Sequence, residues 1–259
     1  MRFIATILAT LAGSLPLWAQ DKTFTITWHG QSYFTVATPK GKKIVFDPHA
    51  IPEFGRQPTT ADIIICSHRH NDHAQPDVVQ NHTSARVFYG LKESVKNRPP
   101  EWDKIDEKIG QIRIRNIGTY HDTNNGMQRG KNSIFIVEAE GITFCHLGDL
   151  GHELEESQIK AIGAVDVLFV PVGGIYTING EKARKVAAAI KPRLFIIPMH
   201  FGMPGYEDLL PVDEFLDGQK LVKKLPLTNE FKFSADLKAD EPTVVVLGWK
   251  KADSDLKKP

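Results

Sequence analysis

Residues 63–73 read Ile-Ile-Ile-Cys-Ser-His-Arg-His-Asn-Asp-His, an apolar run followed directly by three histidines and one aspartate. The run Ile63–Cys66 predicts a short strand buried on both faces. In extended chain, residues two apart point to the same side, so His68 and His70 can reach one metal ion together. If the chain then turns into a helix, the aspartate and the last histidine can reach a second ion. Imidazole and carboxylate groups suit zinc, iron or manganese, so this segment predicts a metal site.

Other strand-like runs also end close to a side chain that can bind a metal ion. They are Ile44–Phe46 with Asp47, Ile142–Cys145 with Asp149, and Leu194–Ile197 with His200. Strands that deliver polar groups at one end build a rigid site at one edge of a scaffold. We therefore expect these side chains to lie near the histidines that follow Cys66.

The order of the apolar patterns predicts two packed β-sheets with helices outside them. Strand patterns cover Phe24–Trp28, Ser32–Ala37, Ile44–Phe46, Ile63–Cys66, Arg86–Tyr89, Gln111–Ile117, Ser133–Ala139, Ile142–Cys145, Val165–Val170, Leu194–Ile197 and Thr243–Gly248. Helical spacing occurs at Pro76–Asn81, Glu155–Ile162, Glu181–Ile190 and Asp213–Leu225. Because hairpin-like pairs come first and helices are interleaved only later, this order favours a sandwich over a doubly wound parallel sheet.

The motif at His68, His70, Asp72 and His73 resembles the signature of the metallo-β-lactamase superfamily. The remaining pieces of that family's pattern follow in the same order: Asp47, His121 in Gly-Thr-Tyr-His-Asp, Gly148-Asp149, and His200 after Pro-Met. The resemblance covers roughly residues 23–205. The stretch Trp-His-Gly-Gln-Ser at 28–32 looks most like the branch that contains L-ascorbate-6-phosphate lactonase, although that branch often has histidine where this chain has Gln31.

The resemblance implies an α/β fold, the αββα sandwich, and a binuclear metal centre. The first metal would be held by His68, His70 and His121, and the second by Asp72, His73 and His200. Asp149 would bridge both ions, and Asp47 would position the metal-binding loop through hydrogen bonds. Two divalent ions are expected, zinc first, with manganese or iron as alternatives.

The same resemblance predicts a hydrolase in which a hydroxide between the metals attacks an ester, lactone or amide bond. Phosphodiester cleavage by the same metal pair is the main alternative, and a redox or non-catalytic metal-binding protein is a third. Antibiotic-degrading members usually have Cys or Ser in place of the bridging aspartate, so Asp149 argues against a true β-lactamase. The candidate catalytic residues are Asp72, His146 and Tyr176, with His152 as a further possible proton donor.

The glycine-rich stretch at residues 171–177 resembles a substrate-side loop in related sequences, although a simple strand-exit turn explains its glycines equally well. The formal net charge is +1, and we find no basic run. The chain is therefore expected to act on a small molecule rather than on nucleic acid. No oligomeric state is predicted.

The first residues have the pattern of a secretory signal peptide. Arg2 precedes the apolar stretch Phe3–Leu11, and small residues follow up to Ala19. An uncleaved anchor or an amphipathic start is the alternative. We expect segment 1–20 to direct export to the periplasm or the medium, residues 21–250 to form one metallo-hydrolase domain without a membrane span, and residues 251–259 to be a polar tail.

Cys66 and Cys145 are the only cysteines in the chain. An exported protein could join them in a disulfide. Both, however, lie at the ends of apolar strand-like runs, where a free cysteine behaves as a small buried hydrophobe. Two buried thiols are therefore favoured over a bridge.

Overall fold

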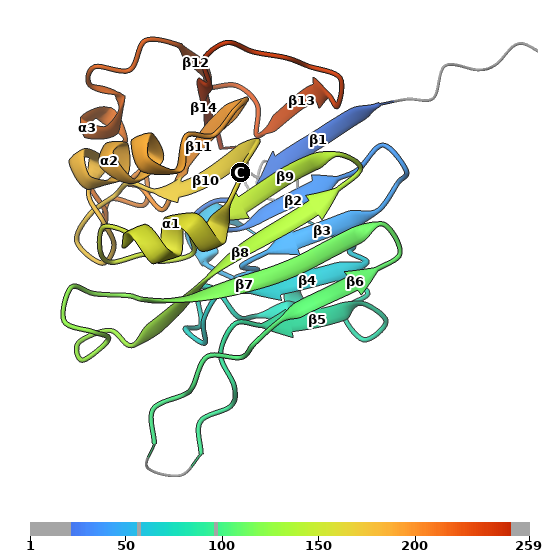
Figure 1. Ribbon diagram of the computed structural model, residues 1–259, viewed down its shortest axis with the longest axis vertical. Helices are drawn as coiled ribbons and strands as arrows, with labels where there is room; N and C mark the ends of the chain where they lie inside the picture. The colour runs from blue at the N-terminus through green and yellow to red at the C-terminus, as the bar shows by residue number, and fades with distance from the viewer. Residues whose placement is uncertain (1–21, 56–57, 96–97, 250–259) are drawn as a thin grey trace, which may run out of the picture.

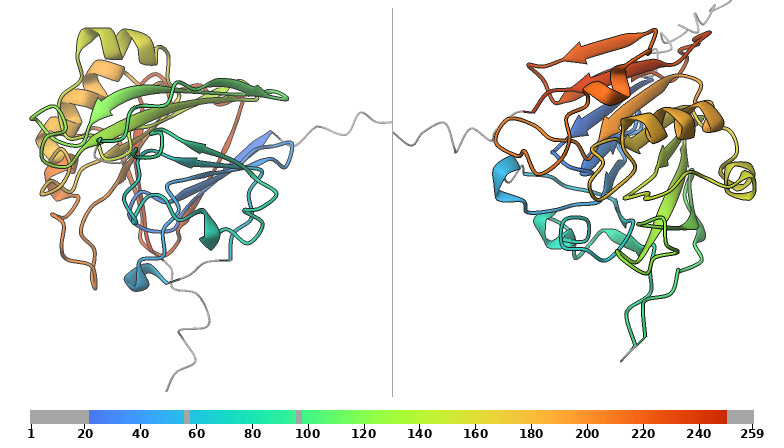
Figure 2. Two further views of the ribbon diagram at one scale, coloured as in Figure 1. Left: turned by 90° about the horizontal axis from the view of Figure 1, so that it is seen from below. Right: turned by 90° about the vertical axis from the view of Figure 1, so that its left-hand side faces the viewer.

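Two mixed β-sheets pack face to face in this protein, and the three α-helices of the described residues lie to one side of the pair (Figures 1 and 2). The computed structural model describes residues 22–55, 58–95 and 98–249. The architecture predicted from the sequence, two packed sheets with helices outside, is confirmed.

The six-stranded sheet has the order β13-β1-β2-β3-β4-β5. Its strands are β1 (Thr23–Trp28), β2 (Phe34–Ala37), β3 (Lys43–Phe46), β4 (Ile63–Cys66), β5 (Arg86–Tyr89) and β13 (Glu230–Ser234). Neighbours are antiparallel from β13 to β3, whereas β3, β4 and β5 run parallel. The carboxyl ends of β3 and β4 therefore lie at the same edge of this sheet.

The eight-stranded sheet has the order β12-β14-β11-β10-β9-β8-β7-β6. Its strands are β6 (Asp106–Ile109), β7 (Ile112–Tyr120), β8 (Lys131–Ala139), β9 (Ile142–His146), β10 (Val167–Pro171), β11 (Phe195–Met199), β12 (Val222–Leu225) and β14 (Thr243–Leu247). β6 to β9 are antiparallel, and β9, β10, β11, β14 and β12 are parallel. The parallel half gathers the ends of β9, β10 and β11 at one edge.

The helices cover the eight-stranded sheet. They are α1 (Glu156–Ile162), α2 (Gly180–Ile190) and α3 (Asp213–Leu216). α2 packs on β10, α1 lies against β7, and α3 contacts α2 (Figure 1). The connections between β3 and β4 and between β4 and β5 contain only the short 3-10 helices η1 (Pro52–Phe54) and η2 (Pro76–Val78) among the described residues.

Aromatic side chains fill the space between the sheets. Phe34 of β2 and Phe169 of β10 place their ring centroids 4.5 Å apart, so they join the two layers directly. Phe46 of β3 packs on the same ring at 5.9 Å. All residues of β4 are buried, as predicted for a strand covered on both faces. Burial of each phenylalanine side chain contributes about 1.5–3 kcal/mol to the free energy of folding. This aromatic layer therefore fixes the two sheets, and the strand ends at their edge, relative to each other.

The structure corrects several predicted elements. The helix predicted over Asp213–Leu225 is wrong beyond Leu216, because Gly218 at φ +72° turns the chain and Val222–Leu225 pairs with β14. Pro76–Asn81 forms only the single turn η2. The short strands β6 and β13 were not predicted: β6 is largely charged, whereas β13 has the alternation of apolar and polar residues that is typical of a half-buried strand.

Both cysteines are free and buried, as predicted. Burial raises the pKa of the Cys145 thiol to about 12, so this thiol stays protonated. The predicted signal segment 1–20 and tail 251–259 lie outside the described residues. No helix in the described ranges is long and apolar enough to cross a bilayer.

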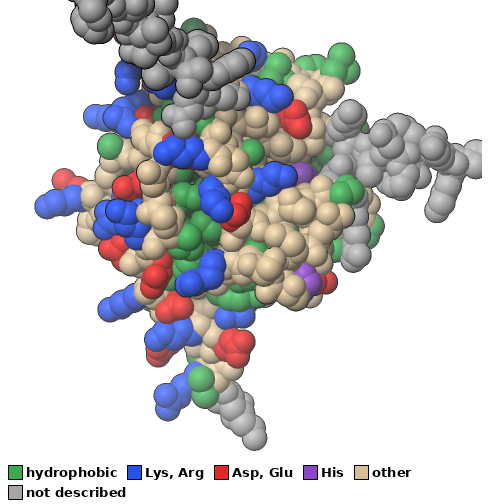
Figure 3. Space-filling model, turned by 90° about the vertical axis from the view of Figure 1, so that its right-hand side faces the viewer, with side chains coloured by type: hydrophobic (Ala, Val, Ile, Leu, Met, Phe, Trp, Pro, Cys, Tyr) green, Lys and Arg blue, Asp and Glu red, His purple; other side chains and the backbone are tan. Residues whose placement is uncertain are grey.

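Charges of both signs are mixed on the side of the molecule shown in Figure 3. Lys42 pairs with Asp62 at 2.7 Å, and Arg113 pairs with Asp106 at 2.8 Å. Such exposed pairs contribute little to stability. Charges of both signs thus lie side by side on the part of this face that the structure describes.

Candidate metal centre

The structure brings the predicted metal-binding residues together in two adjoining groups. Within each group, one potential ligand atom per residue lies within 4.8 Å of every other. The first group consists of His68, His70 and His121, and the second consists of Asp72, His73, Asp149 and His200. The division into two groups follows the one that the family resemblance implied.

Asp149 joins the two groups. Its Oδ2 atom lies 3.0 Å from His121 Nε2, 3.1 Å from His73 Nε2 and 3.2 Å from His200 Nε2. His68 Nε2 is 4.0 Å from the same oxygen. One carboxylate oxygen therefore faces imidazoles of both groups, which is the position that a bridging ligand requires.

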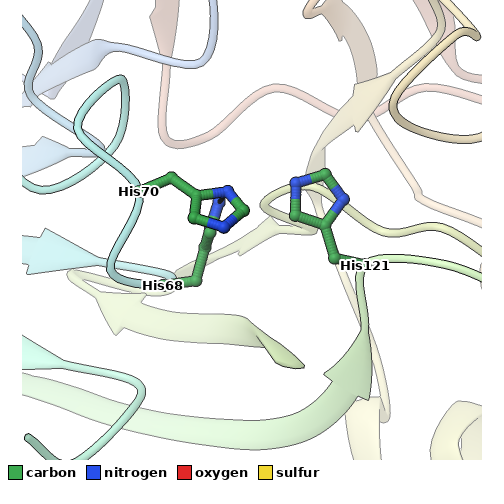
Figure 4. Close-up of side chains that lie close together, drawn as sticks. All are labelled: His68, His70 and His121. Atoms are coloured by element: carbon green, nitrogen blue, oxygen red, sulfur yellow. Dashed lines mark hydrogen bonds between the residues drawn. The ribbon is translucent and has the colours of Figure 1, made fainter. Parts of the chain in front are cut away.

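Strand ends from both sheets deliver these residues. His68 and His70 lie in the loop after β4, and His121 follows β7 and points toward them across the site (Figure 4). Asp149 lies just beyond β9, and His200 directly follows β11. Since the sheets are locked together by their core, side chains far apart in the sequence meet at one edge.

Asp47 organises the histidine loop from behind. Its Oδ1 accepts a hydrogen bond from the Ser67 backbone N–H at 2.7 Å, and its Oδ2 accepts one from the Ser67 hydroxyl at 2.7 Å. Oδ2 also lies 2.8 Å from His73 Nδ1. Asp47 is fully buried and has a left-handed backbone at φ +44°. A non-glycine residue persists in this conformation only where its surroundings hold it.

These hydrogen bonds set the tautomers of two histidines. The Ser67 hydroxyl has one proton, which it donates to Asp47, so it accepts from His68 Nδ1 at 2.9 Å. His73 likewise donates its Nδ1 proton to Asp47. In both rings Nε2 is then the nitrogen that faces Asp149 and that a metal ion can bind once it is deprotonated.

Close backbone contacts hold His200 in place. His200 has φ +52°, and its carbonyl oxygen accepts from Gly173 N–H at 2.9 Å. A Cβ atom added at Gly173 would lie only 2.1 Å from that oxygen. This close approach accounts for one glycine of the 171–177 stretch through packing against a predicted ligand.

The charges of the site are strongly coupled. Burial alone would raise the pKa of Asp149, but the neighbouring His200, His73 and His121 hold it well below its ordinary value. Burial would also raise the pKa of Asp72, but the charge of His73 outweighs burial and lowers it. For His68, burial and then the charge of His73 lower the pKa. The second group thus combines two ionised carboxylates with imidazoles.

The residues present fit divalent cations. His73 Nε2 and Asp149 Oδ1 are buried and have no hydrogen-bond partner among the described residues. Buried polar atoms without partners are unfavourable unless a ligand satisfies them. The donor set of imidazole nitrogens and carboxylate oxygens is the one that zinc, manganese and iron accept.

The candidate proton donors lie in different places. His146 is buried, accepts from Gly148 N–H and donates to the Ser32 carbonyl, so both ring nitrogens are engaged by backbone. Burial lowers its pKa, which favours the neutral ring. His152 is similarly engaged by the backbone of Tyr120 and Glu153. Neither histidine has a free nitrogen for a substrate, and we do not retain them as proton donors.

Tyr176 remains accessible. Its side chain is 47% exposed on the loop after β10, and the Arg129 guanidinium lies 5.7 Å from its ring centroid. Asp72 is the more exposed carboxylate of the site, with 38% of its side chain accessible. His70 is the exposed member of the first group. The accessible side of the two ligand groups is therefore the side of Asp72 and His70.

Sequence reasoning missed two residues that shape the site. Asp122 follows His121 and accepts four backbone N–H bonds, from Asn124, Gly126, Gln128 and Arg129, which fold the next loop. Burial would raise the pKa of Asp122, but these four hydrogen bonds outweigh burial and lower it. Its position beside His121, ahead of a glycine-containing turn, was the available signal. The second residue is Gln31, whose amide nitrogen donates to Asp72 Oδ2 at 3.0 Å.

Comparison with known proteins agrees with this geometry. The model of the β-lactamase superfamily domain matches residues 25–200. The chain belongs to the metallo-β-lactamase superfamily. A crystal structure of a protein from Thermotoga maritima, described as a zinc-dependent hydrolase of this superfamily, is 35% identical, with a TM-score of 0.64 over 87% of this chain and 98% of that one.

Other relatives in the superfamily carry the same type of name. A UPF0173 metal-dependent hydrolase from Thermoplasma acidophilum is 29% identical over 189 residues, 68% of this chain and 82% of the relative. A protein of the same name from Koribacter versatilis is 28% identical over 198 residues. The di-iron β-hydroxylase CmlA from Streptomyces venezuelae, at 11% identity and a TM-score of 0.57, shares the fold alone. The relatives thus place this chain among metal-dependent hydrolases.

Proposed function

We propose that this superfamily member binds two divalent metal ions, zinc first, and hydrolyses an ester, lactone or amide bond of a small molecule. The observation that carries the proposal is the position of Asp149 Oδ2, within 3.2 Å of histidines from both ligand groups. A single-metal site has no need of a carboxylate shared between two adjoining groups. A pair of ions at such a site is a common basis for hydrolysis without a serine or cysteine nucleophile.

Bound ions would supply a water of lowered pKa as nucleophile and an electrophile for the oxygen of the scissile bond. The chain's own residues do the positioning. Asp47 fixes the Nδ1 protons of His73 and, through Ser67, of His68. Asp72 and His70 border the accessible side, where a substrate enters. Tyr176 on the adjoining loop is our candidate for donating a proton to the leaving group.

The choice of a carbonyl substrate follows from the sequence motifs. The 28–32 stretch and the Pro-Met-His motif resemble the branch that contains L-ascorbate-6-phosphate lactonase, which makes lactones the first substrates to test. Asp149 stands where antibiotic-degrading members usually have Cys or Ser, so we do not expect β-lactam hydrolysis. The signal-like segment 1–20 leads us to propose that the protein is exported.

Metal analysis followed by a substrate panel tests the proposal. The purified protein, freed of metal and reloaded with Zn²⁺, is expected to hold two equivalents and to hydrolyse a lactone, an aryl ester or an amide. The panel also contains bis(p-nitrophenyl) phosphate and a β-lactam. Turnover of the phosphodiester alone would replace the carbonyl hydrolase with a phosphodiesterase. A folded sample that holds fewer than two equivalents would overturn the binuclear site, and cell fractionation tests export.

A further inference from the structure

The turn between β1 and β2 contains a glutamine that touches the metal centre. His29 N–H donates to the Tyr33 carbonyl, and Tyr33 N–H donates to the Gly30 carbonyl, which closes the turn. Gln31 lies inside it with a left-handed backbone at φ +50°, and only 2% of the residue is exposed. A glutamine pays a backbone penalty in this conformation that glycine would avoid. Such strain is a feature of functional sites, where the surroundings enforce it.

Gln31 bonds to two members of the second ligand group. Its Nε2 donates to Asp72 Oδ2 at 3.0 Å, and its backbone carbonyl accepts from His200 N–H at 3.1 Å. Asp72 belongs to the loop after β4 in the six-stranded sheet, whereas His200 follows β11 in the eight-stranded sheet. Gln31 therefore connects ligands that arrive from different sheets. The Trp28 indole N–H, which donates to the same carbonyl at 3.0 Å, holds the turn from below.

The orientation of the Gln31 amide is determined by its partner. A carboxylate oxygen accepts hydrogen bonds only, so the amide nitrogen must face Asp72. Asp72 is also the ligand of its group with the most exposed side chain, so packing restrains it least. A directed hydrogen bond has most to contribute at such a ligand.

We propose that Gln31 is a positioning residue for the second cation, which it serves by holding Asp72 and His200 at the spacing that the ion requires. This inference rests on the proposed two-cation site and adds a residue to it. Outer partners of metal ligands typically change metal affinity by about 10–100-fold when they are removed. The effect of Gln31 is confined to the second group, because its hydrogen bonds within the described ranges go to Trp28, Asp72 and His200 and not to a member of the first group.

The experiment is a stepwise titration of the metal-free protein with Co²⁺ or Zn²⁺ against a competing chelator, with the visible spectrum of bound Co²⁺ as a second readout. In Gln31→Met, which keeps the length but removes the amide, the binding step of the second group shifts to about 10–100-fold lower affinity, and the step of the first group stays unchanged. Gln31→Glu places a carboxylate against Asp72, and its loss exceeds that of Gln31→Met. Gln31→Gly also removes the amide, but glycine adopts the left-handed backbone without strain and keeps the carbonyl that accepts from His200. A loss of metal affinity in this variant therefore reflects lost positioning and not lost folding.

Gln75→Met is the matched control. The side chain of Gln75 accepts from Ala50 N–H in a nearby loop, but it does not bond to a ligand. The metal affinities of both binding steps in Gln75→Met are expected to equal those of the unchanged protein. Unchanged affinity of the second group in folded Gln31→Met and Gln31→Gly overturns the inference, as does equal weakening of both groups. If the unchanged protein itself holds fewer than two ions, the proposed function fails instead, so the two failures are distinguishable.

Discussion

The two ligand groups share an edge of the same sandwich but differ in charge and origin. The first, formed by His68, His70 and His121, contains imidazoles only. The second adds the carboxylates of Asp72 and Asp149, whose pKa values are both lowered, so it carries two negative charges. Because attraction to a divalent cation grows with ligand charge, the second group should bind the first equivalent. The first group depends on nitrogen ligands and should discriminate more between metals.

The largest expected effect comes from removing the residue that the groups share. Asp149→Asn keeps the shape but removes the charge that faces His121, His73 and His200. Both binding steps should weaken, and the loss of activity should exceed the roughly 100-fold seen for outer partners of ligands. Metal content by mass spectrometry and kcat/KM on the active substrate measure it. Asp166→Asn is the control, since Asp166 is also buried but bonds to Thr143 and Arg193. Retention of both ions by Asp149→Asn would mean that the groups are independent.

Single-ligand variants should separate the groups. His70→Asn is expected to lower the bound metal by about one equivalent and to leave the second group filled, whereas His200→Asn should do the reverse. Asparagine tolerates the left-handed backbone of His200, so folding is preserved there. The Co²⁺ spectrum of each variant identifies the remaining site, and His82→Asn serves as the control away from the centre. Loss of both ions from either variant would show that one cation cannot stay without the other.

The first group could be predicted largely from the sequence, because His68 and His70 follow a buried strand at a spacing that places both on one side. His200 was indicated by its place after the strand-like run Leu194–Ile197, whereas His121 was indicated only by its order in the family pattern. Their meeting depends on the pairing of strands across both sheets. Gln31 stood out in the sequence only as a departure from the family branch, and nothing indicated its partner: its hydrogen bond to Asp72 spans 41 residues and depends on the shape of one turn.

The errors in the fold have the same cause. Val222–Leu225 contains two lysines and continues a helical pattern, yet it becomes an edge strand because it pairs with Val244–Leu247 of β14. Tertiary pairing overrides local preference at such positions.

His146 was chosen as a candidate proton donor because it lies close to Asp149 in the sequence. As the last residue of β9, however, its side chain points into the core and stacks on Phe46.

A smaller loss of metal affinity is expected when the carboxylate of Asp47, which bonds to the histidine loop, is removed. Asp47→Asn removes the charge that accepts from Ser67 and His73, so both groups lose an orienting contact. Each binding step should weaken by about 10–100-fold, with the larger change in the second group, because His73 is bonded directly. Chelator competition measures both steps. Asp62→Asn, which alters an aspartate at the surface of the same sheet, should change neither. An effect on the first group alone would contradict the hydrogen-bond pattern.

The smallest effect should come from Ser67, and it is the sharpest test of the difference between the groups. The Ser67 hydroxyl links Asp47 to His68 Nδ1, whereas His73 bonds to Asp47 without it. Ser67→Ala should therefore weaken the first group by about tenfold, the lower end for outer partners, and leave the second group unchanged. Ser133→Ala removes another buried hydroxyl, which bonds to the Gly90 carbonyl, and should alter neither step. Equal weakening of both groups in Ser67→Ala would show that Asp47 acts on the loop as one unit, and the two sites would then have to be treated as a single coupled centre.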